Sequence, residues 1–139
     1  VKTCTVNAAG THKIHKAFYQ DSEYLENVTF DEIAVGQSAR LLRTLTLEDI
    51  QAFAAVSGDT NPSHLDNDFA QGSAFQGVVA HGMWGGALIS GLLGNQFPGA
   101  GTVYLDQMLH FVKPVHVGDT LVVTAMVVKL VAPDKRVEF

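Results

Sequence analysis

Apolar and polar residues alternate in two different ways along the chain, and the first half shows helical spacing. Residues 38–45 have the character of a strand. Thr46 then offers an N-cap hydroxyl, with Asp49 three residues later as in a capping box. The apolar positions within 50–54 follow at helical spacing, and Gly58 is a residue type that commonly ends a helix. We therefore expect a strand followed by a capped helix.

The segment 82–94 predicts a long buried helix. It is apolar around most of its circumference, so we expect neighbouring elements to cover it on most sides. A glycine inside a helix costs about 0.5–1 kcal/mol relative to alanine. Close approach of a sheet or a second helix would offset that cost. The small residues recur every four positions and form one ridge: Gly82, Gly86, Ser90 and Gly94.

The spacing changes to that of strands after residue 100. Residues 103–111 alternate between two faces, 121–131 are rich in β-branched residues, and 136–139 begin a third run. A long helix followed by consecutive antiparallel strands predicts an α+β domain with the sheet curled around the helix.

Composition limits the class of protein. The 139 residues suit one domain, and a formal net charge of −5 argues against broad nucleic-acid binding. The single Cys4 cannot form an intrachain disulfide, which fits a cytoplasmic location. Residues 69–105 contain no Asp, Glu, Lys or Arg, but the strongly apolar part, 83–93, would span only about 16 Å as a helix. That is too short for roughly 30 Å of hydrocarbon, so we predict no membrane segment.

The residues that carry chemistry lie between the two predicted helices. Asp59 and His64 are five positions apart across the Asn61-Pro62 turn, and Asn-Pro suits the N-cap and first position of a short helix. Imidazole exchanges protons near neutral pH, and the carboxylate can orient it, orient a water, or carry the second proton. Gly82 opens the long helix, where backbone N–H groups lack helical partners and favour developing negative charge. The pattern therefore favours an enzyme, although each residue alone would be an ordinary turn or surface residue.

Other functional classes receive weaker support. His12 and His15 lie in an N-terminal segment expected to be loose, and His110 and His116 lack the flanking Cys or acidic partners of a zinc site, so we predict no metal. No dinucleotide or phosphate-loop motif and no nucleophile elbow is present. His81 fits a bracing role in its loop better than a ligand-binding one. Trp84 fits the core.

The motifs Asp59-x-Asn61-Pro62-x-His64, Val79-Ala80-His81-Gly82-Met83 and Leu92-Leu93-Gly94 resemble the MaoC-like (R)-specific enoyl-CoA hydratases. The resemblance runs from about Phe30 to the end of the chain. It implies a hot-dog fold, in which an antiparallel sheet wraps a central helix, and assembly as a homodimer or larger. It also implies reversible syn hydration of trans-2-enoyl-CoA to (R)-3-hydroxyacyl-CoA, without a cofactor.

The resemblance also assigns roles by position. Asp59 and His64 would activate water, and the Gly82 N–H would polarise the thioester. Asn61 would support the catalytic loop, and the acyl-CoA would further contact His81, Met83, Trp84, Ser90 and Leu93. The anionic end of CoA would meet a basic residue at the mouth of the site, for which Arg40, Lys113 and Lys129 are candidates.

Domain boundaries and rival functions follow from the same resemblance. Residues 1–27 are expected to be a loose or appended leader and 28–139 the hot-dog domain, whose last strands would follow Phe139. A fusion to a phosphate acyltransferase occurs in similar proteins. The alternatives are a thioesterase, an acyl-carrier-protein dehydratase, or a noncatalytic acyl-CoA-binding domain of a larger acyltransferase-containing protein.

Overall fold

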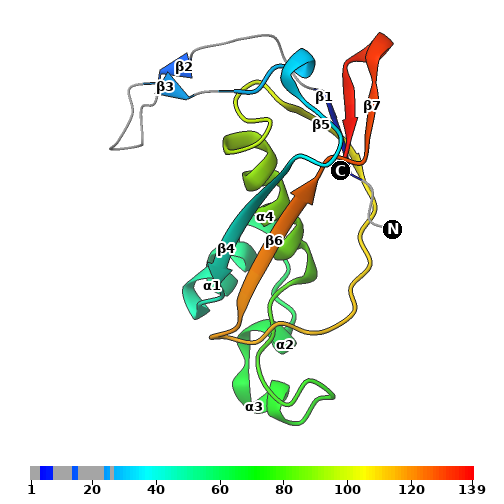
Figure 1. The fold of residues 1–139 in the computed structure, drawn as a ribbon. Coiled ribbons are helices and arrows are strands. Elements are labelled where there is room, and N and C mark those ends of the chain that lie inside the picture. The colour runs from blue at the N-terminus through cyan, green and yellow to red at the C-terminus, as the bar shows by residue number, and fades with distance from the viewer. Residues whose placement is uncertain (1–3, 8–13, 16–23, 26) are drawn as a thin grey trace. The chain divides into compact units, whose positions relative to one another are not determined.

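The computed structural model describes residues 4–7, 14–15, 24–25 and 27–139 (Figure 1). The chain forms two compact units. The first comprises Val1–Leu41, Ile89–His110 and Val123–Phe139, and the second comprises Leu42–Leu88 and Phe111–Val122. The helices are α1 (Leu47–Ser57), α2 (Pro62–Leu65), α3 (Asn67–Gln71) and α4 (Gly82–Asn95), with short 3-10 turns at Phe30–Glu32 and Ala132–Asp134. The strands are β1 (Cys4–Asn7), β2 (Ile14–His15), β3 (Tyr24–Leu25), β4 (Ser38–Thr44), β5 (Val103–Gln107), β6 (Thr120–Met126), β7 (Lys129–Val131) and β8 (Arg136–Glu138).

The first unit contains a four-stranded sheet in the order β5-β1-β8-β7, in which each neighbouring pair is antiparallel. β2 pairs with β3, and β4 pairs with β6. β1 lies within the segment predicted as a leader, although the family resemblance begins near residue 30. The boundary between a leader and a domain at residue 27 stays a prediction.

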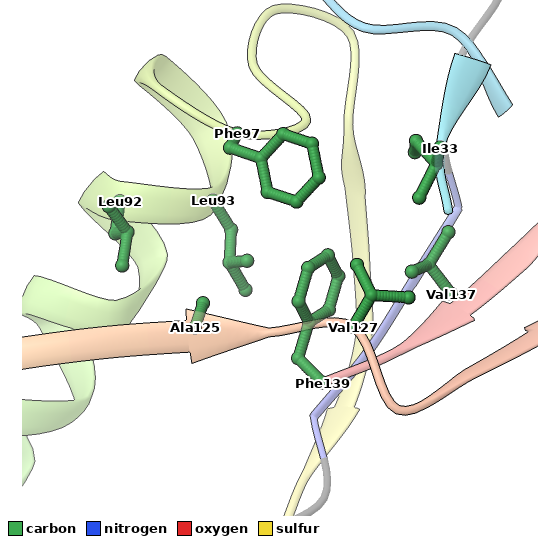
Figure 2. Close-up of a cluster of buried hydrophobic side chains, with 8 residues drawn as sticks. All are labelled: Ile33, Leu92, Leu93, Phe97, Ala125, Val127, Val137 and Phe139. Carbon is green, nitrogen blue, oxygen red and sulfur yellow. The ribbon is translucent and has the colours of Figure 1, made fainter. Parts of the chain in front are cut away.

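A buried cluster fills the first unit and fixes the C-terminal half of α4 against the strands. Figure 2 shows Leu92 and Leu93 of α4 beside Ala125 of β6, with Phe97 and Phe139 close by. The rings of Phe97 and Phe139 meet edge to face at 5.9 Å, a favourable aromatic geometry. The complete cluster is Ile33, Leu92, Leu93, Phe97, Ala125, Val127, Val137 and Phe139.

The predicted strand 121–131 is interrupted where it changes partners. The Val127 N–H donates to the Gln37 carbonyl, just before β4, whereas the Val128 N–H donates to the Glu138 carbonyl of β8. The run is divided into β6, which pairs with β4, and β7, which pairs with β8. The predicted strand 103–111 likewise ends early, at Gln107.

α4 is covered except along one face. Gly82, Met83, Ala87 and Ser90 are exposed, while Trp84, Leu92 and Leu93 are buried. At Gly82 an added Cβ would lie 3.1 Å from the ring of Phe111, a residue of neither a strand nor a helix, so the predicted close approach of a sheet or second helix is not what crowds this end of the ridge. At Gly94 an added Cβ would meet nothing within 4 Å.

In the second unit, local sequence signals set the start and end of α1 as predicted. The Thr46 side chain accepts from the Asp49 N–H, and Asp49 accepts from the Thr46 N–H, which completes a capping box. Gly58 ends the helix in the left-handed conformation, with φ at 74°. Leu45, Ile50 and Trp84 form the buried cluster of this unit, which confirms the core position predicted for Trp84.

The carboxylate of Asp49 predicts a pH-dependent contribution to stability. Burial raises its pKa, but hydrogen bonds from Arg43 and Thr46 outweigh burial and hold the pKa below its usual value. A pKa lowered by folding stabilises the native state above the unfolded-state pKa, and this stabilisation is lost as the pH falls through the folded pKa. We expect Asp49→Asn to lower the free energy of unfolding by about 1 kcal/mol at pH 7. Urea titrations at pH 7 and pH 3 measure it.

The matched control for that experiment is Glu48→Gln. Glu48 is an exposed carboxylate in the same first turn, so it tests the helix dipole without the capping box. A loss of equal size at both pH values for Asp49→Asn would contradict the argument.

None of the helices in the described ranges is long and apolar enough to span a membrane.

Candidate active site

Consecutive side-chain-to-backbone hydrogen bonds shape the loop that follows α1. The Asp59 N–H donates to Ser57 Oγ at 3.2 Å, and the Asn61 N–H donates to Asp59 Oδ1 at 3.2 Å. The Ser63 N–H donates to Asn61 Oδ1 at 3.0 Å, so Asn61 caps α2 as the sequence predicted. Asp and Asn favour such turns because their short side chains reach the backbone two residues on. The loop therefore gives Asp59 a defined backbone conformation.

His64 lies on α2, and its ring is fixed by a distant carbonyl. Its Nδ1 is 2.8 Å from the Val79 carbonyl oxygen. A carbonyl can only accept, so neutral His64 carries its proton on Nδ1 and has a lone pair on Nε2. That Nε2 lies 4.0 Å from Asp59 Oδ2. The Asp59 side chain is 54% exposed and that of His64 16%, so the pair lies open to solvent on the Asp59 side.

His81 lies behind this pair. Its Nε2 is 2.9 Å from the Asp59 backbone carbonyl oxygen, and its ring stacks on that of His64 with centroids 3.8 Å apart. The Phe53 ring is tilted against the His81 ring, with their centroids 5.1 Å apart. His81 is only 3% exposed. The predicted bracing role agrees with these contacts better than the alternative of substrate contact.

Gly82 follows His81 directly and begins α4. Gly82 is exposed, and no acceptor for its backbone N–H is found among the described residues. The Phe111 ring packs against its Cα side. A free N–H at a helix N-terminus favours an anionic or partly anionic oxygen.

The spacing between Asp59 and His64 suits a bridging water. The 4.0 Å gap is too long for a direct hydrogen bond. An oxygen about 2.8 Å from both atoms would see them at an angle of about 90°, close to the angle between the two O–H bonds of water. Both protein atoms accept, so the water would donate one hydrogen bond to each of them and point its lone pairs away. Such a water is activated as a nucleophile.

Asp59, His64 and His81 also form a trio of possible metal ligands, with one ligand atom from each lying within 4.8 Å of the others. The two imidazoles are stacked with 27° between their planes. A ring nitrogen's lone pair lies in the plane of its ring, so these lone pairs run side by side instead of converging. A metal would require one ring to turn. The prediction that the protein uses no cofactor stays a prediction.

The remaining predicted residues are scattered. Met83 and Ser90 are exposed on α4, whereas Trp84 and Leu93 are buried in the cores of the second and the first unit. The acyl-pocket roles of Ser90 and Leu93 stay predictions, and full burial of Leu93 gives its role no support. Of the basic candidates, Lys129 pairs with Glu138 at 3.2 Å, while Arg40 and Lys113 are exposed. The His12/His15 pair lies outside the described side chains.

Two contributors to the site were missed by sequence reasoning. Phe111 was treated as a strand residue, and its contact with Gly82 depends on where the chain goes after β5 ends. Val79 acts through its backbone carbonyl, which no side-chain pattern marks. Val79 forms an isolated antiparallel β-bridge with His116, 37 positions later in the sequence, which is a tertiary feature.

The MaoC like domain family matches residues 30–138. An (R)-specific enoyl-CoA hydratase of Rhodospirillum rubrum is 44% identical over 110 residues, which cover 79% of this chain and 76% of that protein. A solved R-hydratase from Pseudomonas aeruginosa, in its unliganded form, superposes with a TM-score of 0.73 at 39% identity, covering 81% of each chain. A mitochondrial 3-hydroxyacyl-[acyl-carrier-protein] dehydratase of Arabidopsis thaliana is 39% identical over 89 residues, covering 64% of this chain and 52% of that protein.

The chain belongs to the MaoC-like dehydratase family, and its fold is the α+β hot-dog fold. The predictions of family, fold class and hydro-lyase class are thereby confirmed.

Proposed function

We propose that this protein is an (R)-specific enoyl-CoA hydratase. The observation that carries the proposal is the His64–Asp59 pair: an imidazole whose Nδ1–H is committed to the Val79 carbonyl, and whose Nε2 lone pair faces a carboxylate oxygen across 4.0 Å. This is the equipment needed to hold a water and take a proton from it. The names of the relatives support trans-2-enoyl-CoA as the substrate class.

The chemical steps follow from that tautomer. His64 Nε2 accepts a proton from the bridging water as the water oxygen bonds to C3 of the enoyl thioester, and the C2=C3 π electrons move toward the thioester oxygen. The Gly82 N–H stabilises the enolate charge that develops there. His64 then returns the proton to C2, which completes the addition of one water. Because one side chain on one face takes and returns the proton, the addition is syn.

Asp59 has a different role from His64 in this scheme. Its Oδ1 accepts from the Asn61 N–H, which leaves Oδ2, facing His64, to accept a hydrogen bond from the second O–H of the water. The carboxylate orients the water and stabilises the imidazolium that forms. The sequence alone left the two roles open.

The test is hydration of crotonyl-CoA by the purified chain. We expect loss of the absorbance of the conjugated thioester and an (R)-3-hydroxybutyryl-CoA product by chiral analysis. Release of free CoA thiol would instead indicate a thioesterase. Binding of acyl-CoA without turnover would indicate the noncatalytic domain.

A second candidate is an acyl-carrier-protein dehydratase, favoured by the similarity to the Arabidopsis protein. The two are separated by comparing kcat/KM for crotonyl groups on CoA and on acyl carrier protein. A preference of more than tenfold for the carrier protein would move the assignment to the dehydratase.

A homodimer, a cytoplasmic location and a phosphate acyltransferase fusion stay predictions. The homodimer is supported by exposed apolar side chains on 108–112, where Met108, Phe111 and Val112 are 68%, 61% and 74% exposed. Such side chains lose unfavourable contact with water when a second copy covers them.

A further inference from the structure

His81 is a buried histidine that the catalytic scheme does not use. Among the residues that the structure describes, His81 is the one buried residue classed as polar or charged, and it is 3% exposed. Polar side chains are costly to bury, so an apolar residue would fill this space more favourably. The contacts of the imidazole must explain its presence.

The hydrogen bond of His81 fixes its tautomer. The Asp59 carbonyl can only accept, so His81 Nε2 carries the proton. Nδ1 then has only a lone pair, and it is buried with no hydrogen-bond partner among the described residues. One ring nitrogen therefore has a hydrogen-bond partner and the other has none. The favourable contacts of the side chain are the Nε2–H bond and the stacking of its ring face.

Those two contacts reach both members of the catalytic pair. The Nε2–H bond holds the backbone of Asp59, 22 residues away, and the ring face lies 3.8 Å from the ring of His64. The Asp59 side chain is otherwise held by the Asn61 N–H, a bond within its own loop. A bond to the Asp59 backbone therefore sets where the whole turn sits relative to His64.

The position of His81 in sequence adds a third connection. It directly precedes Gly82, whose N–H begins α4, and its own carbonyl accepts from the Trp84 N–H in the first turn of the helix. A tether from this residue to Asp59 ties the start of α4 to the acid/base loop.

We propose that His81 is a positioning residue that sets the distance between Asp59 and His64 through its Nε2–H bond and its stacked ring. The proposal rests on the proposed hydratase function and goes beyond it. His81 does not contact substrate, because it is almost entirely buried. It acts by keeping the 4.0 Å gap at the width that one water fills.

Two substitutions separate the contacts. His81→Phe keeps a stacking ring but removes the donor, and His81→Gln keeps an N–H donor but removes the ring. A displacement near 1 Å at a reacting centre can cost about 10²-fold in rate. We expect His81→Phe to lower kcat for crotonyl-CoA by about 10- to 100-fold with KM within about twofold, and His81→Gln to recover part of that loss.

The matched control is His116→Phe. His116 also lies in the second unit, and its side-chain partners are the Phe75 carbonyl, 3.1 Å from Nε2, and the Asp119 carboxylate, 3.9 Å from Nδ1. We expect its kcat to equal that of the unmodified protein. An unchanged kcat in folded His81→Phe, a rise in KM alone, or no recovery in His81→Gln would each overturn the proposal.

Amide hydrogen exchange decides the positioning role independently of turnover. If the tether holds the loop, the Asp59, Asn61 and Ser63 amides exchange faster in His81→Phe and unchanged in His116→Phe. Unchanged exchange in His81→Phe overturns the tether. Absence of crotonyl-CoA turnover in the unmodified protein, with faster loop exchange in His81→Phe, would refute the proposed function and leave the tether standing.

Discussion

Asp59→Asn is expected to lower kcat for crotonyl-CoA hydration by about 10²- to 10⁴-fold, the contribution typical of a positioned acid/base group. The amide oxygen can still accept from the Asn61 N–H, so the turn at the start of the loop is retained. The amide nitrogen would then face His64 Nε2 and donate to its lone pair, in place of the carboxylate that held the water. Steady-state kinetics should show the loss in kcat with little change in KM.

Asp66→Asn is the matched control for this change. Asp66 caps α3 by accepting from the Asp68 and Phe69 N–H groups, and Asn is an equally good cap. We expect its activity to be unchanged. Retention of more than a tenth of the activity by Asp59→Asn would contradict the assignment.

A double variant tests whether the pair acts as a unit. His64→Gln alone should be as inactive as Asp59→Asn, and the combination should be little worse than either. Groups that hold one water between them lose their function together, so their effects do not add. Additive losses would mean that the two residues act on separate steps.

Gly82→Ala is expected to lower kcat by about 10- to 100-fold while the protein stays folded. The N–H is retained, but the added methyl stands beside it and keeps the thioester oxygen from the 2.7–3.1 Å that an effective donor needs. The new Cβ would lie 3.1 Å from the ring of Phe111. That ring is 61% exposed and can move by the few tenths of an ångström required. Single-turnover kinetics with crotonyl-CoA measure the loss at the chemical step.

Two further variants separate the possible causes of that loss. Phe111→Ala in the Gly82→Ala background removes the crowding, so recovery of activity would show that a displaced ring, and not a blocked N–H, was responsible. Gly85→Ala is the control for adding a methyl to α4, because nothing lies within 4 Å of its Cβ position. It should raise stability by about 0.5–1 kcal/mol and leave kcat unchanged.

The sequence predicted those features that depend on near neighbours. The capping box of Thr46 and Asp49, the stop at Gly58 and the Asn61 cap of α2 each involve residues at most four apart, and all are present. The start of α4 at Gly82 was also predicted from the residues of the helix itself.

The features that it did not predict depend on partners far along the chain. The predicted strand 121–131 is divided between two partners, since β6 pairs with β4 and β7 pairs with β8. The exposed face of α4 depends on which elements of this chain reach it. The tautomer of His64 depends on the Val79 carbonyl, 15 residues away, so proton roles could not be assigned from the sequence.

The loop after α1 is held by two kinds of hydrogen bond, one between near neighbours and one between residues far apart in the sequence. In its three turn bonds the side chains of Ser57, Asp59 and Asn61 each accept from the N–H two residues later. Each bond closes a very short loop, so it costs little conformational entropy to form. The bonds that locate the loop, from His64 to Val79 and from His81 to Asp59, span 15 and 22 residues. A short peptide of residues 57–66 should therefore sample these turns in water, while the spacing of its carboxylate and imidazole would be set only by the intact protein.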